Sequence, residues 1–450
     1  MDPRTRRLVL TAVLCVARAV ALVLQWYQLR LRLFHQLITL LIEHGGPEEF
    51  GDVARRTIPR TVFYHSHIAF GMIEVPPGGL TLEALATIPH VRFFSAFRMS
   101  AASFAMLYDR CHRHLPVAEE DRLLVLLVAI FRLASGCLYR VLSVSAGFPV
   151  TTVKEWCLMG ENALARGLST EIRLPEPGTA ERQAINDDFY QAFLLNNGRQ
   201  DGEGESWHNI CGAIDGTHIY MKRSWDIDDA SYRDRNGQLS LLVHAMASYD
   251  LTFTHTAVAF PGSTHDSGAF RHTALWDPVR PYRPPAIVGE DQLIIADSAY
   301  AVSEYVIPAF KRDAGAHDLI PNQRNFNKAL SSLRNCVERA FRLLKARWLV
   351  LSLIHARSHD RAVLSINCSL YLHNFCLRQD LGEYVGEFQD PDPELGADDP
   401  DSDEEGPTPG EIAAPIGDRV PNLRVRESKR NRMVQELRNR VGGRQPQARQ

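Results

Sequence analysis

Two aspartates stand at places in this sequence where an acid is costly unless a cation or a hydrogen-bond donor compensates it. Asp215 interrupts an apolar run flanked by glycine, and Asp297 directly follows the apolar run Leu293–Ala296. Burying an ionised carboxylate without a partner is strongly unfavourable. Carboxylates at the ends of buried strands are also common where α/β folds bind ligands. Taken singly, each aspartate is equally well explained as a cap or a turn residue.

A third acid, Glu338, lies in a segment whose apolar residues recur at helical spacing. Arg334 and Arg342 fall one turn to either side of it, and Lys345 falls two turns further on. One helix face therefore presents an acid framed by cations, which suits the binding of a metal ion together with a phosphate. The alternative is a row of ordinary ion pairs on a solvated face.

Asp266 is the fourth candidate, in a Ser- and Gly-containing stretch before a short helical segment. It is equally well interpreted as a metal ligand or as a helix cap. His218, His265 and His373 lack the spacing of a transition-metal site, so we interpret them as hydrogen-bonding neighbours.

Acids supplied by separate chain segments are the ligands that hard divalent cations require. Two such cations about 4 Å apart activate a water or hydroxyl, neutralise a phosphate and stabilise the leaving oxygen. The chemistry to which these residues point is therefore phosphodiester cleavage with Mg²⁺ or Mn²⁺, most simply with two ions.

The elements that must position these acids form an α/β domain. Three short, apolar, β-branched runs predict strands: Ile210 to Ile219, Leu239 to Ser248 and Thr252 to Phe260. A long helix is predicted from Asn327 to Leu351. We expect the α/β domain to cover residues 205–380, and the apolar helical stretches before it predict an all-helical domain over residues 90–200.

A helix-turn-helix-like element is predicted at about residues 137–165. A short helix, Leu138 to Val144, is followed by a turn that ends at Pro149 and by a second helix to about Leu164. Thr151 or Thr152 with Glu155 has the spacing of a capping box. In the functional interpretation, the side chains at the start of the second helix face DNA, namely Thr151, Thr152 and Lys154. An ordinary helix pair with a glycine turn fits the spacing equally well.

Five sequence motifs resemble Harbinger/PIF-type transposases and their domesticated nuclease relatives. In chain order they are AIDGTHI, PGSTHDS, ADSAY, NxxxSxxRxxVERxFxxLKxRW and YLHNFC, within residues 207–376. The resemblance implies an RNase H-like (DDE) catalytic domain preceded by a helix-turn-helix-like region. It assigns Asp215, Asp297 and Glu338 to the catalytic triad and Asp266 to the metal site. Arg342 departs from the pattern, because relatives commonly have glycine there.

The resemblance also implies partners and a location. DNA is the expected substrate, a separate Myb-like protein is the expected partner, and the nucleus is the expected compartment. Association with a second copy of the chain is left open. The contacts to the phosphate backbone are assigned to five cations: Lys222, Arg223, Arg334, Arg342 and Lys345. These charges must act locally, because the whole chain has a formal net charge of -3.

The ends of the chain differ in composition from its middle. Residues 1–45 predict an amphipathic helix, although three early arginines before an apolar run also allow a membrane or secretory segment. Residues 388–423 read as an acidic, disordered linker, and residues 424–450 as a basic tail that is either a nuclear-targeting or phosphate-binding arm or a solvated helix. Eight scattered cysteines without CxxC pairs favour reduced intracellular thiols.

Three classes of function remain open from the sequence. The first is a DNA endonuclease or transposase, and the intact acids favour it. The second is a domesticated factor that keeps the fold, binds DNA or protein and does not cleave. The third, a membrane-anchored protein, rests only on the first helix, and we expect no membrane partner.

Overall fold

The computed structural model describes residues 81–146, 148–222, 230–311, 319–356, 358–380 and 423–438. All of them fall in one compact unit, Ser66–Gln450. The predicted amphipathic helix of residues 1–45 and nearly all of the predicted acidic linker lie outside the described residues. No helix among the described residues combines the length and the apolar character needed to cross a bilayer.

The described residues before Trp207 form helices and no strand, as the sequence predicted. The longer helices are α4 (His90–Phe97), α5 (Ala101–Cys111), α6 (Glu119–Ser135), α7 (Tyr139–Ala146), α8 (Val150–Gly167) and α9 (Ala180–Asn196), after the short α3 (Leu82–Ala86). α6 begins with three acids that complement the positive end of the helix dipole. It ends at Gly136, whose φ of 64° is the left-handed conformation typical of a helix C-cap.

The predicted helix pair at residues 137–165 is present as α7 and α8, but the predicted capping box is wrong. α8 begins at Val150, with Pro149 as its N-cap and no side-chain cap. Thr151 and Thr152 therefore lie inside the first turn instead of before it. The fixed φ of proline, here -55°, already suits a helix start, so the helix begins directly after Pro149.

A five-stranded mixed sheet forms the centre of the α/β part, in the order β3-β2-β1-β4-β5. Its strands are β1 (Ile210–Tyr220), β2 (Ser240–Ala247), β3 (Phe253–Pro261), β4 (Leu293–Ala296) and β5 (Val306–Pro308). β1, β2 and β3 pair antiparallel, whereas β4 runs parallel to β1 and β5 parallel to β4. The three strands predicted from the sequence are confirmed to within two residues at each end.

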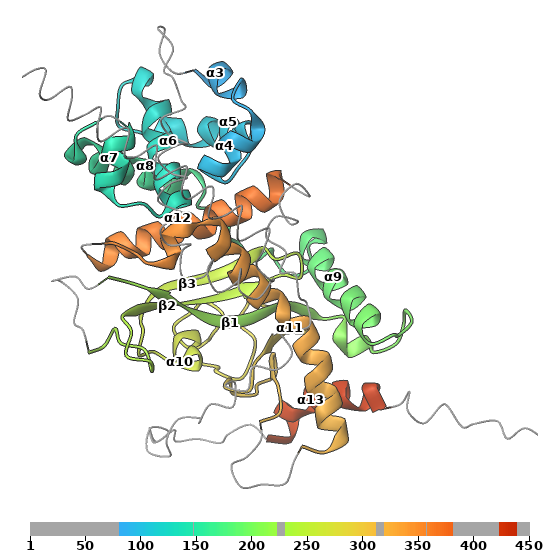
Figure 1. Ribbon diagram of the computed structural model, residues 1–450. Helices are drawn as coiled ribbons and strands as arrows, with labels where there is room; N and C mark the ends of the chain where they lie inside the picture. Colours follow the sequence, from blue (N-terminus) through green and yellow to red (C-terminus); the bar gives the residue numbers. More distant parts are fainter. Residues whose placement is uncertain are drawn as a thin grey trace, which may run out of the picture. The chain divides into compact units, whose positions relative to one another are not determined.

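The two faces of the sheet are covered by different elements. α11 (Pro321–Arg347) crosses one face over β1, and α12 (His359–Gln379) packs beside it against β3 (Figure 1). Ala213 and Ile295 belong to the hydrophobic cluster on this side, together with Leu333 and Val337 of α11. A smaller cluster covers the other face, around Phe270 at the end of α10 (Asp266–Phe270). Residues of β1 that alternate along the strand therefore meet α11 or α10.

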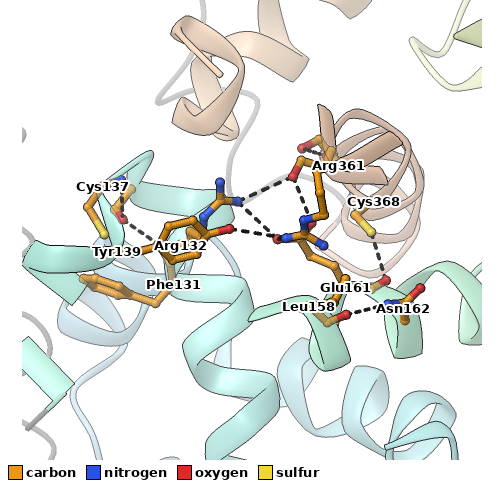
Figure 2. Close-up of polar contacts among 12 residues, drawn as sticks. Phe131, Arg132, Cys137, Tyr139, Leu158, Glu161, Asn162, Arg361 and Cys368 are labelled. Atoms are coloured by element: carbon orange, nitrogen blue, oxygen red, sulfur yellow. Dashed lines mark hydrogen bonds and ion pairs between the residues drawn. The ribbon is translucent and has the colours of Figure 1, made fainter. Parts of the chain in front are cut away.

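A buried ionic cluster connects α12 to helices α6 and α8 (Figure 2). Glu161 of α8 is fully buried, and Arg132 of α6 donates to its Oε1 over 3.1 Å. From α12, Arg361 donates to the same oxygen over 3.3 Å and Ser365 donates to Oε2 over 2.8 Å. The Cys368 thiol donates to the carbonyl of Glu161. Because a buried carboxylate without these donors is strongly destabilising, the cluster fixes α12 against the helical part.

The helix of the basic tail, α13 (Leu423–Arg438), packs against α11 and is not wholly solvated. Met433 is fully buried. Arg199 donates to the carbonyls of Glu436 and Leu437 near the end of the helix. The guanidinium of Arg430 lies 4.0 Å from the centre of the Phe310 ring. The solvated-helix interpretation is corrected by these contacts, because an apolar side chain and the C-terminal carbonyls of α13 contact residues of the folded part that precede it in the chain.

Candidate active site

The register of two parallel strands brings Asp215 and Asp297 to adjacent positions. Ala213 of β1 faces Ile295 of β4. Asp215 lies two residues after Ala213, and Asp297 lies two residues after Ile295. Because β1 and β4 are parallel, both carboxylates therefore lie at the same end of this strand pair. Asp297 comes directly after the last residue of β4. Both placements agree with the strand positions expected from the sequence.

Asp266 approaches β1 from the face opposite α11. It is the first residue of α10, and its Oδ1 occupies the space above Gly216. A Cβ built on Gly216 would stand only 1.8 Å from this oxygen. The glycine next to Asp215 is therefore required for Asp266 to come this close.

Glu338 and Arg334 come from α11, one turn apart. Nη1 of Arg334 lies 3.1 Å from Oδ2 of Asp215, and its Nη2 lies 2.5 Å from Oε1 of Glu338. The side chains of Asp215, Arg334 and Glu338 are 17%, 20% and 33% exposed. The ion pair along the helix that the sequence allowed is present, but it faces the sheet and includes an acid from β1 instead of lying on a solvated surface.

The four acids act on one another electrostatically. Burial is the main cause that raises the pKa of Asp215 to about 7, and Arg334 opposes it. The charges of Asp266, Asp297 and Glu338 add to the effect of burial. Burial and the charge of Asp297 raise the pKa of Asp266 to about 6, and burial also raises the pKa of Asp297. Such a cluster favours any cation that reaches it.

Tyr300 and His244 border the acids, and the sequence analysis did not single out either. The Tyr300 hydroxyl lies 3.0 Å from Nε2 of His244, and both side chains are buried. Burial, then the charges of Asp266 and two further aspartates, raises the pKa of Tyr300 well above its usual value. Burial lowers the pKa of His244 to about 3, so the ring is neutral at pH 7. Tyr300 could have been found from its place in the ADSAY motif, whereas nothing in the apolar β2 sequence marked His244.

Lys345 is tied to β1 beside Asp215. Its Nζ donates to Oγ1 of Thr217 over 2.7 Å and to the carbonyl of His218 over 3.1 Å. Burial lowers the pKa of this lysine. These bonds hold α11 in register with β1, and they place a cation two residues from Asp215 along the strand. Its predicted role at the phosphate backbone stays a prediction.

The other predicted contacts to the DNA backbone are placed as follows. Lys222 is exposed just beyond β1, where its backbone N–H donates to the carbonyl of Ile354. Arg342 is exposed on α11 and donates to Oδ1 of Asn335 over 3.3 Å. Arg223 lies outside the described residues. Arg334 is engaged by the acids, as described above.

At the start of α8, Thr151 is exposed, and Thr152 and Lys154 are partly exposed. Nζ of Lys154 lies 6.0 Å from the centre of the Tyr139 ring. All three side chains can be reached from solvent, so their predicted contact with DNA stays open as a prediction.

The histidines behave as hydrogen-bonding neighbours where the structure shows a partner. Nδ1 of His218 lies 3.0 Å from Oγ of Ser240, and Nε2 of His373 donates to the carbonyl of Leu251. The interpretation is confirmed for these two. His265 is exposed at the N-cap of α10.

The chemistry of the donor set suits Mg²⁺ or Mn²⁺, because carboxylate oxygens are the ligands that these ions prefer. Within the part of the chain that the structure describes, however, no three His, Cys, Asp or Glu side chains gather closely enough to hold one metal ion. The side chain between Asp215 and Glu338 is that of Arg334. The carboxylate oxygens are thus chemically suited to these cations, and Arg334 already contacts two of them, Oδ2 of Asp215 and Oε1 of Glu338.

Comparison with known proteins finds matches that include the α/β part of the chain. Residues 214–374 match the family model described as DDE superfamily endonuclease. The chain is 24% identical over 272 residues to the Arabidopsis thaliana protein named antagonist of like heterochromatin protein 1, covering 58% of this chain and 63% of that protein. It is also 24% identical over 155 residues to an Arabidopsis thaliana ALP1-like protein, covering 32% of this chain and 37% of the relative. The chain thus matches less than two thirds of the length of either relative. No solved structure matches it.

The matched region begins one residue before Asp215 and ends within α12. It therefore contains all four acids and the whole of the helix that carries Glu338. The family drawn from the sequence motifs agrees with both the family model and the relatives. Over residues 214–374, the chain is therefore similar to the DDE superfamily endonucleases.

Proposed function

We propose that this chain is a metal-dependent DNA endonuclease or transposase of the Harbinger type, which cuts and joins DNA phosphodiester bonds. Asp215, Asp297 and Glu338 are its catalytic acids, and Asp266 is a further ligand of the metal site. The observation that carries the proposal is the β1 and β4 register, which sets two aspartates side by side under the helix that supplies Glu338.

In this proposal, residues 205–380 have an RNase H-like fold and residues 90–200 a DNA-binding helical fold. The support is positional. Asp215 lies on the first strand, Asp297 directly after the fourth, and Glu338 on a late helix, as the family pattern expects. α7 and α8 have helix-turn-helix spacing.

Each acid has a distinct part in binding. Asp215 and Asp297 present oxygens from adjacent strand positions, Asp266 presents one from the opposite face, and Glu338 presents one from above the sheet. When bound at these oxygens, Mg²⁺ or Mn²⁺ supplies activation of a water or a DNA 3′-hydroxyl and stabilisation of the leaving oxygen. The exposed Lys222 and Arg342 bind the phosphate backbone and orient the strand.

A nuclease assay tests the proposal directly. The full chain is incubated with DNA that carries terminal repeats, with Mg²⁺, Mn²⁺ or EDTA. Cleavage is expected only with a metal, and Asp215→Asn, Asp297→Asn and Glu338→Gln should each reduce it at least a hundredfold, on the order of the loss of one essential group. Asp121→Asn, an exposed acid at the start of α6, is the matched control. Cleavage that persists in the three variants would refute the mechanism.

A second candidate is a non-cleaving factor that keeps the fold and binds DNA or protein. Two observations favour it. A relative is named for antagonism of a heterochromatin protein, and Arg334 already pairs with two of the acids. The same assay separates the candidates, because this one predicts DNA or protein binding without cleavage in either metal. In both cases the proposal places the protein in the nucleus, with a Myb-like protein as its partner.

A further inference from the structure

Arg334 occupies an unusual position for a side chain of an acidic site. Its two terminal nitrogens contact carboxylates from two different elements, Asp215 of β1 and Glu338 of α11. The planar guanidinium is the side-chain cation that can bind two carboxylates with two fixed donors. Because its side chain is only 20% exposed, these contacts are little screened by water.

The acids around Arg334 stabilise its positive charge. Burial alone would lower the pKa of this arginine, but Asp215, Glu338 and Asp297 outweigh burial and raise it. Two other cations act on the cluster from its edges, Lys311 on Asp297 and Arg235 on Asp266. At Asp215, Arg334 is the cation that opposes both burial and the charges of the other acids.

The same oxygens are the ones that a divalent cation needs. Oδ2 of Asp215 and Oε1 of Glu338 each accept from a nitrogen of Arg334 within 3.1 Å. A metal ion about 2.1 Å from those oxygens and a guanidinium cannot both occupy the space between them. We propose that Arg334 is a resident counter-ion of the acidic site, which keeps Asp215 and Glu338 together without metal and competes with divalent cations for their oxygens.

This inference rests on the proposed function, in which the acids hold divalent cations. It adds that the affinity for metal is set by Arg334 as well as by the acids. A divalent cation bound at these oxygens would release the guanidinium from Asp215 and Glu338, and its charge would then be available to a DNA phosphate. Arg334 is in this sense a positioning residue.

The test measures Mn²⁺ binding to the full chain by calorimetry at pH 8, together with the unfolding temperature in EDTA and in saturating Mn²⁺. Arg334→Met removes the charge and keeps an apolar stem. We expect this variant to bind Mn²⁺ roughly tenfold more tightly, because a competing cation is lost. Its unfolding temperature in EDTA should be lower than that of the wild type. Saturating Mn²⁺ should raise its unfolding temperature by more than it raises that of the wild type. Arg324→Met, on the same helix and exposed, should match the wild type in all three measurements.

Arg334→Lys keeps a cation in case the methionine variant does not fold. A single ammonium cannot bind two carboxylates as the fork does, so we expect an affinity between those of the wild type and Arg334→Met. Mn²⁺ affinity that is unchanged or weaker in the Arg334 variants overturns the inference while leaving the proposed function intact. Absence of Mn²⁺ binding in the wild type, or binding that survives Asp215→Asn and Glu338→Gln, overturns the proposed function itself.

Discussion

At the scale of single residues, the site depends on Gly216, because this residue has no Cβ. Asp266 reaches the other acids because Gly216 has no Cβ, and a methyl group there would overlap its Oδ1. Gly216→Ala should therefore push Asp266 out of the cluster with little effect on the strand, where alanine is acceptable. We expect cleavage to fall roughly a hundredfold, as misplacement of a catalytic group by about 1 Å can cause.

The control for this prediction is Gly268→Ala in α10, where the added Cβ meets only Thr264 at 3.9 Å. Cleavage rate and unfolding temperature are measured for both variants. A Gly216→Ala protein that cleaves like the wild type would show that Asp266 does not take part, and the role assigned to it would have to be withdrawn.

At the scale of elements, the sequence predicted more of the site than of its surroundings. The strand carrying Asp215 and the helix carrying Glu338 were visible, because hydrophobic patterning survives in long elements, whereas the four-residue strand before Asp297 was visible only as an apolar run. The contact of Arg334 with Asp215 was not visible, since helical spacing relates it only to Glu338 and Arg342. Pairing across 119 residues of chain depends on how α11 crosses β1, which no local pattern encodes.

The helix pair α7 and α8 gives a prediction about DNA. Thr151 is exposed in the first turn of α8, where a negative charge would meet the phosphate backbone. Thr151→Glu should weaken DNA binding about tenfold at moderate salt. Asn162→Glu, exposed three turns later on the same helix, should change it much less. Affinity is measured by fluorescence anisotropy, and equal losses in the two variants would argue against α8 as the element that meets DNA.

His373 of α12, which bonds to the turn between β2 and β3, should make the free energy of unfolding fall in acid. His373 is fully buried, and burial lowers its pKa to about 4. An unfolded histidine titrates near 6.5, so below that pH the unfolded chain binds a proton that the folded chain refuses. Stability contributed by His373 is therefore complete above about pH 6.5 and is lost as the pH falls toward 4.

His373→Gln can still donate to the Leu251 carbonyl but cannot titrate. Relative to its own stability at pH 7.5, this variant should lose about 2 kcal/mol less than the wild type at pH 5. Urea unfolding across this range measures the difference. If the free energy of unfolding of His373→Gln changes with pH in parallel with that of the wild type, burial does not hold His373 neutral in the folded chain.

At the scale of the whole molecule, the sequence suggested a boundary near residue 388 after which the chain leaves the folded part. α13 packs on the folded part beyond that boundary. Met433 is buried, and Glu436 accepts hydrogen bonds from the backbone N–H and the hydroxyl of Ser206. Composition could not predict this docking, since one buried methionine in a basic helix leaves almost no periodic signal.

If Met433 anchors α13, then Met433→Asp should release the helix without unfolding the rest. A buried carboxylate with no partner costs more than the helix gains by docking, so the helix should leave and the loss of stability should stop at the docking free energy, about 1–3 kcal/mol. Limited proteolysis should then cut within residues 423–438 at least tenfold faster while the α/β part stays intact. Gln435→Asp adds the same charge at an exposed position of the helix and should be cut like the wild type. Equal protection of α13 in all three proteins would show that its contacts with α11 are not what holds it.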